Sequence, residues 1–306
     1  MTAAIKADNL VKVFGEVRAL DGFSVEVAAG EVFGLVGPDG AGKTTAMRLL
    51  TGIMDPTAGD AWVFDRHTVR QAEAIKDDIG YMSQRFGLYP DLTVQENIDF
   101  YADIFDVPRQ GRRERIDRLL AFSNLAPFRS RLAGNLSGGM KQKLGLTCTL
   151  VHTPKVSFLD EPTNGVDPVS RRDFWRILYQ LVRQGVTIFV STAYLDEAER
   201  CNRIGLIHRG RLLAVGTPDD IRGLMRSTIT AIHTGRARDA ARVLKDRLAG
   251  ATVTLFGDRV HVATDRPHPE NALEGSGIAV LDVRTVEPTL EDVFVSVLSK
   301  RQEDPS

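Results

Sequence analysis

A glycine-rich segment between an apolar run and a helical pattern constrains the fold of this chain more than any other feature. Residues 37–44 read Gly-Pro-Asp-Gly-Ala-Gly-Lys-Thr, which fits the spacing G-x-x-x-x-G-K-[ST]. Val32–Val36 before it is typical of a buried strand, and Met47, Leu50 and Met54 after it recur at helical spacing. A glycine-rich loop that opens a helix points backbone N–H groups at an anion, beside the positive end of the helix dipole. The segment therefore predicts a strand, a phosphate-binding loop and a helix.

This loop predicts a nucleoside triphosphate site. We expect Lys43 to reach the terminal phosphates and the hydroxyl of Thr44 to ligate a magnesium ion. A chance glycine turn is the structural alternative. The loop residues expected to bind the nucleotide are Gly37, Pro38, Asp39, Gly40, Ala41, Gly42, Lys43, Thr44 and Thr45.

The composition is that of a globular protein with room for one large domain and one small one. Of 306 residues, 43% are apolar and 26% are charged. The net charge of −1 implies no strong bulk attraction to nucleic acid, so we expect no nucleic-acid partner. No stretch approaches the ~18 apolar residues of a membrane span, so another chain would have to supply any span. Cys148 and Cys201 form no CxxC pair and are expected to be buried free thiols.

Strand and helix patterns alternate along the central part of the chain. Residues 156–159 and 187–190 are typical of buried parallel strands, and a helical pattern over 171–183 separates them. Residues 204–207 and 212–215 flank a turn and predict a hairpin. This alternation predicts an α/β protein.

The pattern changes near residue 224. A closing helix is expected over 219–225, followed by short strands and one basic helix over 237–248. Thr289 is expected to cap a final amphipathic helix. We therefore predict a first domain over 1–224 and a second over 225–306 that ends in a frayed tail from residue 302.

Two adjacent carboxylates, Asp160 and Glu161, follow one of the buried strands. The carboxyl ends of strands are where α/β sheets bind ligands. We expect Asp160 to hold the magnesium ion, through water, and Glu161 to polarise the attacking water. Acids at strand ends are common, but the phosphate loop makes this pair significant.

Ser137, Gly138 and Gly139 form a third motif. Ser137 can cap the helix that follows, and the two glycines let the backbone approach an anion closely. An ordinary helix start is the structural alternative.

Together these motifs resemble the ATP-binding subunits of ABC (ATP-binding cassette) transporters, over roughly residues 4 to 222. The resemblance implies a P-loop NTPase cassette: a mixed sheet with helices, an antiparallel β subdomain and a helical subdomain over about 88–150. Residues 286–295 resemble the closing segment of drug- and lipid-exporter cassettes, which ends a small α+β accessory domain. ATP and Mg²⁺ are the implied cofactors.

The resemblance also implies individual roles. Gln84 would act in catalysis and join the metal site to the membrane partner, and Phe14 would stack on adenine, although it could equally be a core residue. Residues 137–139 would contact the terminal phosphate of ATP bound to an opposing cassette. Asp167 would lie in the loop that crosses between cassettes. Residues 86–89 would form a docking patch for the membrane subunit, with a buried core loop as the alternative.

The implied function is an ATPase subunit that powers export of a drug- or lipid-like substrate through a separate membrane permease. It would act beside a second cassette, identical or different, on the inner face of the cell membrane. The alternatives are a largely non-hydrolytic cassette that completes a partner's site, or an ABC ATPase outside transport. The interval between Gln84 and Ser137 is too short for the long coiled coil of the DNA-repair type.

Two residues depart from the family pattern. Ala193 stands where the family has a histidine that contacts the terminal phosphate, and Asp39 stands where asparagine is usual. Loss of one positioned donor typically costs ~10²–10³ in rate. The departures are similar to those of the first cassette in tandem exporters. They predict a weakened ATP site and a heterodimer with a more complete cassette, with harmless drift as the alternative.

Overall fold

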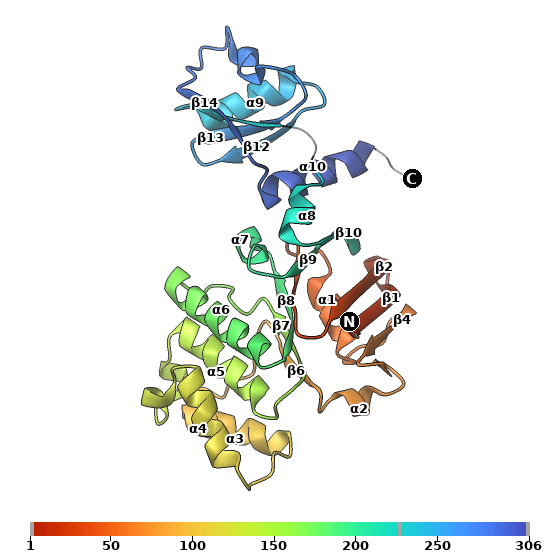
Figure 1. The fold of residues 1–306 in the computed structure, drawn as a ribbon, viewed down its shortest axis with the longest axis vertical. Coiled ribbons are helices and arrows are strands. Elements are labelled where there is room, and N and C mark those ends of the chain that lie inside the picture. The colour runs from red at the N-terminus through yellow and green to blue at the C-terminus, as the bar shows by residue number, and fades with distance from the viewer. Residues whose placement is uncertain (1–2, 226–227, 304–306) are drawn as a thin grey trace. The chain divides into compact units, whose positions relative to one another are not determined.

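The computed structural model describes residues 3–225 and 228–303 (Figure 1). It divides into two compact units, Met1–Val215 and Gly216–Ser306. The expected boundary after residue 224 lies farther along the chain, so that helix α8 (Pro218–Arg222) falls in the second unit rather than the first. Residues 226 and 227, just after the expected boundary, lie outside the described part.

A six-stranded sheet in the order β10-β9-β3-β8-β7-β6 organises the first unit. Neighbours from β9 to β6 pair in parallel, so their carboxyl ends meet at one edge. The strands are β3 (Val32–Val36), β6 (Ile79–Met82), β7 (Val156–Asp160), β8 (Thr187–Thr192), β9 (Arg203–His208) and β10 (Arg211–Gly216). Every residue of β3, β7 and β8 is buried, as expected for central parallel strands. The strands predicted near 156, 187, 204 and 212 are confirmed.

Helices α1 and α6 pack on this sheet. Helix α1 (Lys43–Leu50) begins directly after the glycine-rich loop and contacts β7. Helix α6 (Pro168–Arg183) contacts β8 and begins before the predicted residue 171, because Asp167 caps it and proline suits its first turn. The phosphate-loop residues and the acids at the end of β7 therefore lie at the same edge of the sheet.

An antiparallel sheet in the order β2-β1-β4-β5 completes this part of the unit. Its strands are β1 (Ala3–Phe14), β2 (Val17–Ala28), β4 (Ala58–Val63) and β5 (Arg66–His67), with the short helix α2 (Ala72–Ile75) after them. In β2, Val25 and Val27 are buried and alternate with the exposed Ser24 and Glu26. Their side chains join the core beneath α1.

Three helices, α3 (Val94–Ile104), α4 (Arg112–Phe122) and α5 (Gly138–Leu150), share a core of their own. Ile98, Leu120 and Leu144 are fully buried in it. Helix α4 ends at Phe122, and Asn124 two residues later adopts a left-handed conformation with φ 58°. The short helix α7 (Leu195–Ala198) follows β8.

The second unit is an α+β arrangement. Its sheet has the order β12-β13-β11-β14, from β11 (Ile229–His233), β12 (Thr252–Phe256), β13 (Arg259–Ala263) and β14 (Asp282–Val286). Helices α9 (Ala237–Arg247) and α10 (Leu290–Glu303) belong to it, and Thr289 caps α10 together with Asp292, as predicted for Thr289. The expected frayed tail is wrong for Gln302 and Glu303, which continue α10. Residues 304–306 lie outside the described part.

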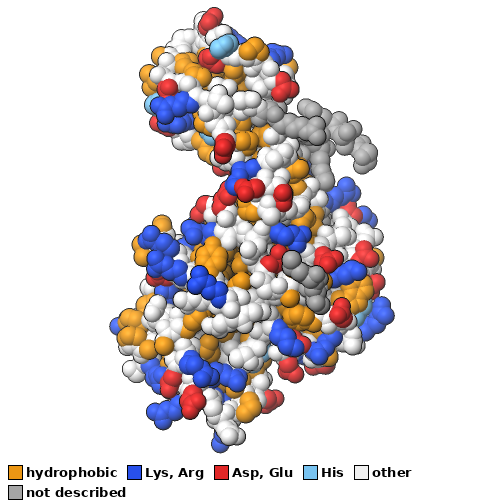
Figure 2. Space-filling view, in the orientation of Figure 1, with side chains coloured by type: hydrophobic (Ala, Val, Ile, Leu, Met, Phe, Trp, Pro, Cys, Tyr) orange, Lys and Arg blue, Asp and Glu red, His pale blue; other side chains and the backbone are white. Residues whose placement is uncertain are grey.

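Charges of both signs are scattered over the visible face in Figure 2. This agrees with the formal net charge of −1. Across the described residues, no helix combines the length and apolar character needed to cross a membrane.

Candidate functional site

A cavity of about 500 Å³ opens at the carboxyl edge of the parallel sheet. It lies between the glycine-rich loop, the start of β2, the turn between β9 and β10, and the two residues Gln84 and Glu161. Its lining residues are Val17, Arg18, Ala19, Asp39, Gly40, Gly42, Lys43, Thr44, Thr45, Gln84, Glu161, Arg209 and Gly210.

The loop requires glycine at Gly37 and Gly42, the two glycines of the pattern, and favours it at Gly40 between them. Gly40 and Gly42 adopt φ of 75° and 107°, in the left-handed region that favours glycine. A Cβ on Gly42 would also lie 2.6 Å from the carbonyl oxygen of Ala19, and one on Gly37 would lie 2.2 Å from that of Ile207. The close packing leaves a bare backbone that faces the cavity, which fits a phosphate group.

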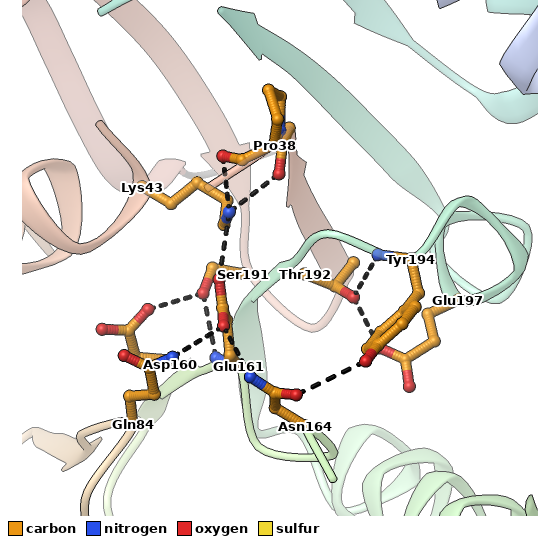
Figure 3. A network of polar contacts seen from close by, with 11 residues as sticks. Pro38, Lys43, Gln84, Asp160, Glu161, Asn164, Ser191, Thr192, Tyr194 and Glu197 are labelled. Atoms are coloured by element: carbon orange, nitrogen blue, oxygen red, sulfur yellow. Dashed lines mark hydrogen bonds and ion pairs between the residues drawn. The ribbon is translucent and has the colours of Figure 1, made fainter. Parts of the chain in front are cut away.

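Lys43 reaches from the first turn of α1 to both sides of the site (Figure 3). Its side chain is only 4% exposed. Its Nζ donates to the carbonyl oxygens of Gly37 at 2.7 Å and Pro38 at 3.0 Å, and it lies 3.0 Å from Oε1 of Glu161. The ammonium group is therefore held beneath the loop, between the phosphate cradle and the carboxylate.

Asp160 ends β7 and is 1% exposed. Its Oδ1 accepts a hydrogen bond from Oγ of Ser191 at 2.6 Å, while its buried Oδ2 has no hydrogen-bond partner among the described residues. Burial, and then the charge of Asp160, raise the pKa of the neighbouring Tyr81. A buried carboxylate oxygen without a partner suits a cation, and so the residues present fit a magnesium ion.

Glu161 has a strained backbone. Its φ of 49° is unusual for a residue with a side chain. Its N–H group donates to Oγ of Ser191 at 3.0 Å and to the carbonyl oxygen of Ser191 at 3.2 Å. These bonds to β8 hold the conformation that turns the carboxylate toward Lys43, where Nε2 of Gln84 also donates to Oε2 at 2.9 Å.

A second cavity of about 240 Å³ adjoins the same carboxylate. Its lining residues are Asp39, Glu161, Thr163, Asn164, Thr192, Ala193 and Tyr194. Ala193 is exposed and offers only a methyl group. Asp39 lines both cavities, so its carboxylate belongs to the site rather than to a remote surface.

The structure brings most of the predicted loop and metal residues together. Gly37 and Pro38 contribute carbonyl oxygens to Lys43 rather than cavity lining, and Ala41 is buried at 3% exposure. Phe14 does not line the cavity. It is 46% exposed, with its ring 5.2 Å from Nζ of Lys12, and its contact with adenine stays a prediction.

The segment 137–139 also lies outside this cavity. The Oγ of Ser137 accepts a hydrogen bond from the N–H group of Met140 at 3.3 Å and so caps α5. A Cβ on Gly139 would lie 2.5 Å from Cβ of Ser170, so helix packing accounts for this glycine. A Cβ on Gly138 would meet only the carbonyl oxygen of Gly165, at 4.0 Å, so Gly138 is the more open of the two glycines.

Asp167 likewise serves a helix. Its Oδ1 accepts from the N–H groups of Val169 at 3.1 Å and Ser170 at 2.9 Å. Hydrogen bonds with Ser170 lower the pKa of Asp167. Its role between cassettes stays a prediction.

Sequence reasoning missed several residues of the site. Arg209 and Gly210 were expected only as a hairpin turn, yet the N–H group of Gly210 donates to the carbonyl oxygen of Ala41 and closes the turn over the loop. The sequence signal that could have indicated this position was the glycine, because Gly210 adopts a left-handed conformation with φ 77°. Asn164 and Tyr194 contact the site through side chains whose reach no spacing rule predicts.

Comparison with known proteins gives consistent likenesses. A family model described as ABC transporter matches residues 20–164. The chain is 42% identical over 281 residues to the probable multidrug ABC transporter ATP-binding protein YbhF of Escherichia coli (strain K12). That alignment covers 89% of this chain and 48% of YbhF. The chain is 34% identical over 311 residues to the daunorubicin resistance ATP-binding protein DrrA2 of Streptomyces coeruleorubidus, covering 98% of this chain and 97% of that one. This chain thus spans about half the length of YbhF.

Solved structures agree. An ATP-binding subunit of an ABC transporter matches with a TM-score of 0.65 at 28% identity, covering 72% of this chain and 92% of that one. The dimeric structure of MJ0796, a bacterial ABC transporter cassette, matches with a TM-score of 0.64 at 27% identity, covering 70% and 98%. These likenesses confirm the cassette fold that the sequence predicts.

Proposed function

Because the chain belongs to the ATP-binding protein family of ABC transporters, we propose that it binds ATP with Mg²⁺ at the glycine-rich loop. We further propose that it hydrolyses the ATP to power export through a separate membrane permease. Lys43, bonded at once to the loop carbonyls and to Glu161, carries this proposal, because it joins the phosphate cradle to the candidate base.

The loop supplies the binding chemistry. Backbone N–H groups at the start of α1 and the ammonium group of Lys43 attract the phosphates. Thr44, Asp160 and Gln84 are the residues that would hold the magnesium ion. When bound, that ion would offset charge on the phosphate oxygens.

Hydrolysis requires a water oxygen to attack the terminal phosphorus as the bond to the bridging oxygen of ADP breaks. Glu161 is placed to orient this water and to accept its proton. A phosphate group that attracts Lys43 frees Oε1 of Glu161 for that task. Phosphate release from ATP by the purified chain, measured with Mg²⁺ or with excess chelator, tests the proposal. Release at the same rate in both conditions would overturn it.

We propose a second cassette as partner. Ser137, Gly138 and Asp167 lie outside the cavity that contains Lys43, which supports a site completed by an opposing chain. The solved cassette MJ0796 is described as dimeric. An identical partner would give an ATP-dependent homodimer in sedimentation, and a different one would leave the chain monomeric.

The names of the relatives favour export. YbhF is described as a multidrug protein and DrrA2 as a daunorubicin resistance protein. We accordingly propose a drug- or lipid-like substrate and a position on the inner face of the cell membrane. Within residues 86–89, Phe86 and Leu88 are half-buried against the helical core, whereas Gly87 is exposed and Tyr89 is 45% exposed. Gly87 and Tyr89 are therefore the residues that a permease could contact. The second unit would be the accessory domain of such exporters.

A cassette with little turnover of its own is the second candidate. Ala193 favours it, because the second cavity has no donor at that position. The contacts of Glu161 with Lys43 and Gln84, and of Asp160 with Ser191, favour hydrolysis instead.

A further inference from the structure

We propose that Tyr194 and Asn164 form a positioning pair that holds Glu161 in the orientation needed to activate water. This proposal rests on the proposed ATPase function and concerns the same site. It assigns a role to residues around the second cavity, where Ala193 supplies no polar group.

Tyr194 is fixed at three points. Its N–H group donates to Oγ1 of Thr192 at 3.0 Å, and its ring lies 4.6 Å from the guanidinium carbon of Arg171. Its hydroxyl donates to Oδ1 of Asn164 at 3.4 Å. Figure 3 shows the ring directed toward Asn164 and the end of β7.

Asn164 links the side chain of Tyr194 to the carboxylate of Glu161. Its Nδ2 donates to Oε2 of Glu161 at 3.3 Å. An asparagine amide has a donor end and an acceptor end, and the reversed amide would set its oxygen against the carboxylate. A donor on Oδ1 therefore selects the amide orientation whose NH₂ group faces Glu161. The tyrosine hydroxyl is that donor.

A buried network around Glu197 fixes the chain segments that carry Asn164 and Tyr194 relative to each other. Glu197 is fully buried and accepts hydrogen bonds from Oγ1 of Thr163 and Oγ1 of Thr192. Its Oε1 also lies 3.4 Å from Nε of Arg171. Thr163 and Thr192 precede Asn164 and the 193–194 segment respectively, so Glu197 ties both chain segments together.

The two oxygens of Glu161 thereby have separate partners. Oε1 contacts Lys43, whereas Oε2 accepts from Gln84 and from Asn164. When a phosphate draws Lys43 away, Oε2 stays held by the two amides and Oε1 is directed to the water. Loss of the tyrosine hydroxyl would leave the amide free to reverse and the carboxylate free to turn.

The test compares Tyr194→Phe, Asn164→Ala and the double variant by ATP turnover and by equilibrium binding of a fluorescent ATP analogue. Tyr179→Phe is the matched control, since Tyr179 is 37% exposed and its hydroxyl donates to the carbonyl oxygen of Arg200, away from both cavities. Each site variant should lower kcat about 3- to 10-fold, the range expected for one hydrogen bond. KM and nucleotide affinity should stay unchanged.

Coupling decides the result. The kcat of the double variant should be no lower than that of the more impaired single variant, because each single substitution already breaks the same chain of hydrogen bonds from Tyr194 through Asn164 to Glu161. Unchanged kcat in Tyr194→Phe, or losses that multiply, would overturn the positioning pair. Lower affinity in parallel with lower kcat would indicate a structural role and also overturn it. A wild-type rate equal to that of Glu161→Gln would instead overturn the proposed function.

Discussion

Lys43 Nζ lies 3.0 Å from Oε1 of Glu161, and both side chains are nearly buried, at 4% and 10% exposure. The two opposite charges compensate each other at a place where most of each side chain is removed from water. A phosphate group at the loop would compete for the ammonium group and release the carboxylate. Binding of the nucleotide and availability of the base are thus linked through one ion pair.

The first prediction concerns this lysine. Lys43→Ala should weaken ATP binding about 10- to 100-fold, because hydrogen bonds to charged groups contribute about 1.5–3 kcal/mol. Titration with a fluorescent nucleotide measures the change in Kd. Lys76→Ala, at an exposed lysine paired with Glu73, should leave Kd unchanged. An unaltered Kd in Lys43→Ala would place the phosphates elsewhere.

Restoring the missing donor is the second prediction. Ala193→His should raise ATP turnover, by up to about 10²-fold if the imidazole recovers one full transition-state contact. Steady-state phosphate release at saturating ATP measures it. No increase would mean that Ala193 does not limit the reaction.

The third prediction concerns the cysteines. Burial raises the pKa of both thiols, and for Cys201 the charge of Glu197 adds to the effect. A raised pKa reduces the reactive thiolate at neutral pH. Cys148 and Cys201 should therefore resist a thiol reagent in the folded protein and react fully in guanidinium chloride. Rapid reaction of either thiol before unfolding would show that its region opens.

A carboxylate in the second unit gives the fourth prediction. Asp292 is 2% exposed, lies 3.1 Å from Nδ1 of His261 and accepts from Thr289 at the start of α10. Burial acts to raise the pKa of Asp292, but the hydrogen bonds with His261 and Thr289 outweigh it and lower the value. The stabilisation is then present above the unfolded-state pKa and is lost as pH falls through the folded-state pKa.

Asp292→Asn should accordingly cost about 1–3 kcal/mol at neutral pH and remove that part of the acid dependence. Hydrogen exchange of residues 229–303 in the full chain, followed from neutral pH into the acid range, measures both effects. Asp265→Asn, at an exposed carboxylate of the same unit, is the control. Equal protection in the two variants would contradict a role for the His261–Asp292 pair.

The residues that could be predicted from sequence are those tied to backbone geometry. The spacing of Gly42, Lys43 and Thr44 specifies a loop and a helix start, and Asp160 and Glu161 follow a strand that its apolar run identifies. Parallel pairing then places both groups at one sheet edge. Local patterning was sufficient because each motif carries its own backbone conformation.

The contacts between side chains could not be predicted in this way. The bond from Asn164 to Glu161 depends on a left-handed residue at position 161, and the place of Tyr194 depends on a buried network around Glu197. The second unit begins at Gly216, before the predicted boundary at residue 224, for a similar reason. Helix α8 contacts α10, which lies more than 60 residues later in the chain. Such long-range packing leaves no periodic signal in the sequence.

The most direct test of the account is a single-turnover comparison of wild type with Glu161→Gln, with protein in excess over ATP and Mg²⁺ present. The Glu161→Gln variant should bind ATP at least as tightly as wild type, because the loop and Lys43 remain and no carboxylate competes with the phosphate for the ammonium group. Its rate of ATP cleavage should fall about 10²–10⁴-fold, as for loss of a general base. Equal cleavage rates in the two proteins would contradict the assignment of Glu161 and of this site as the centre of hydrolysis.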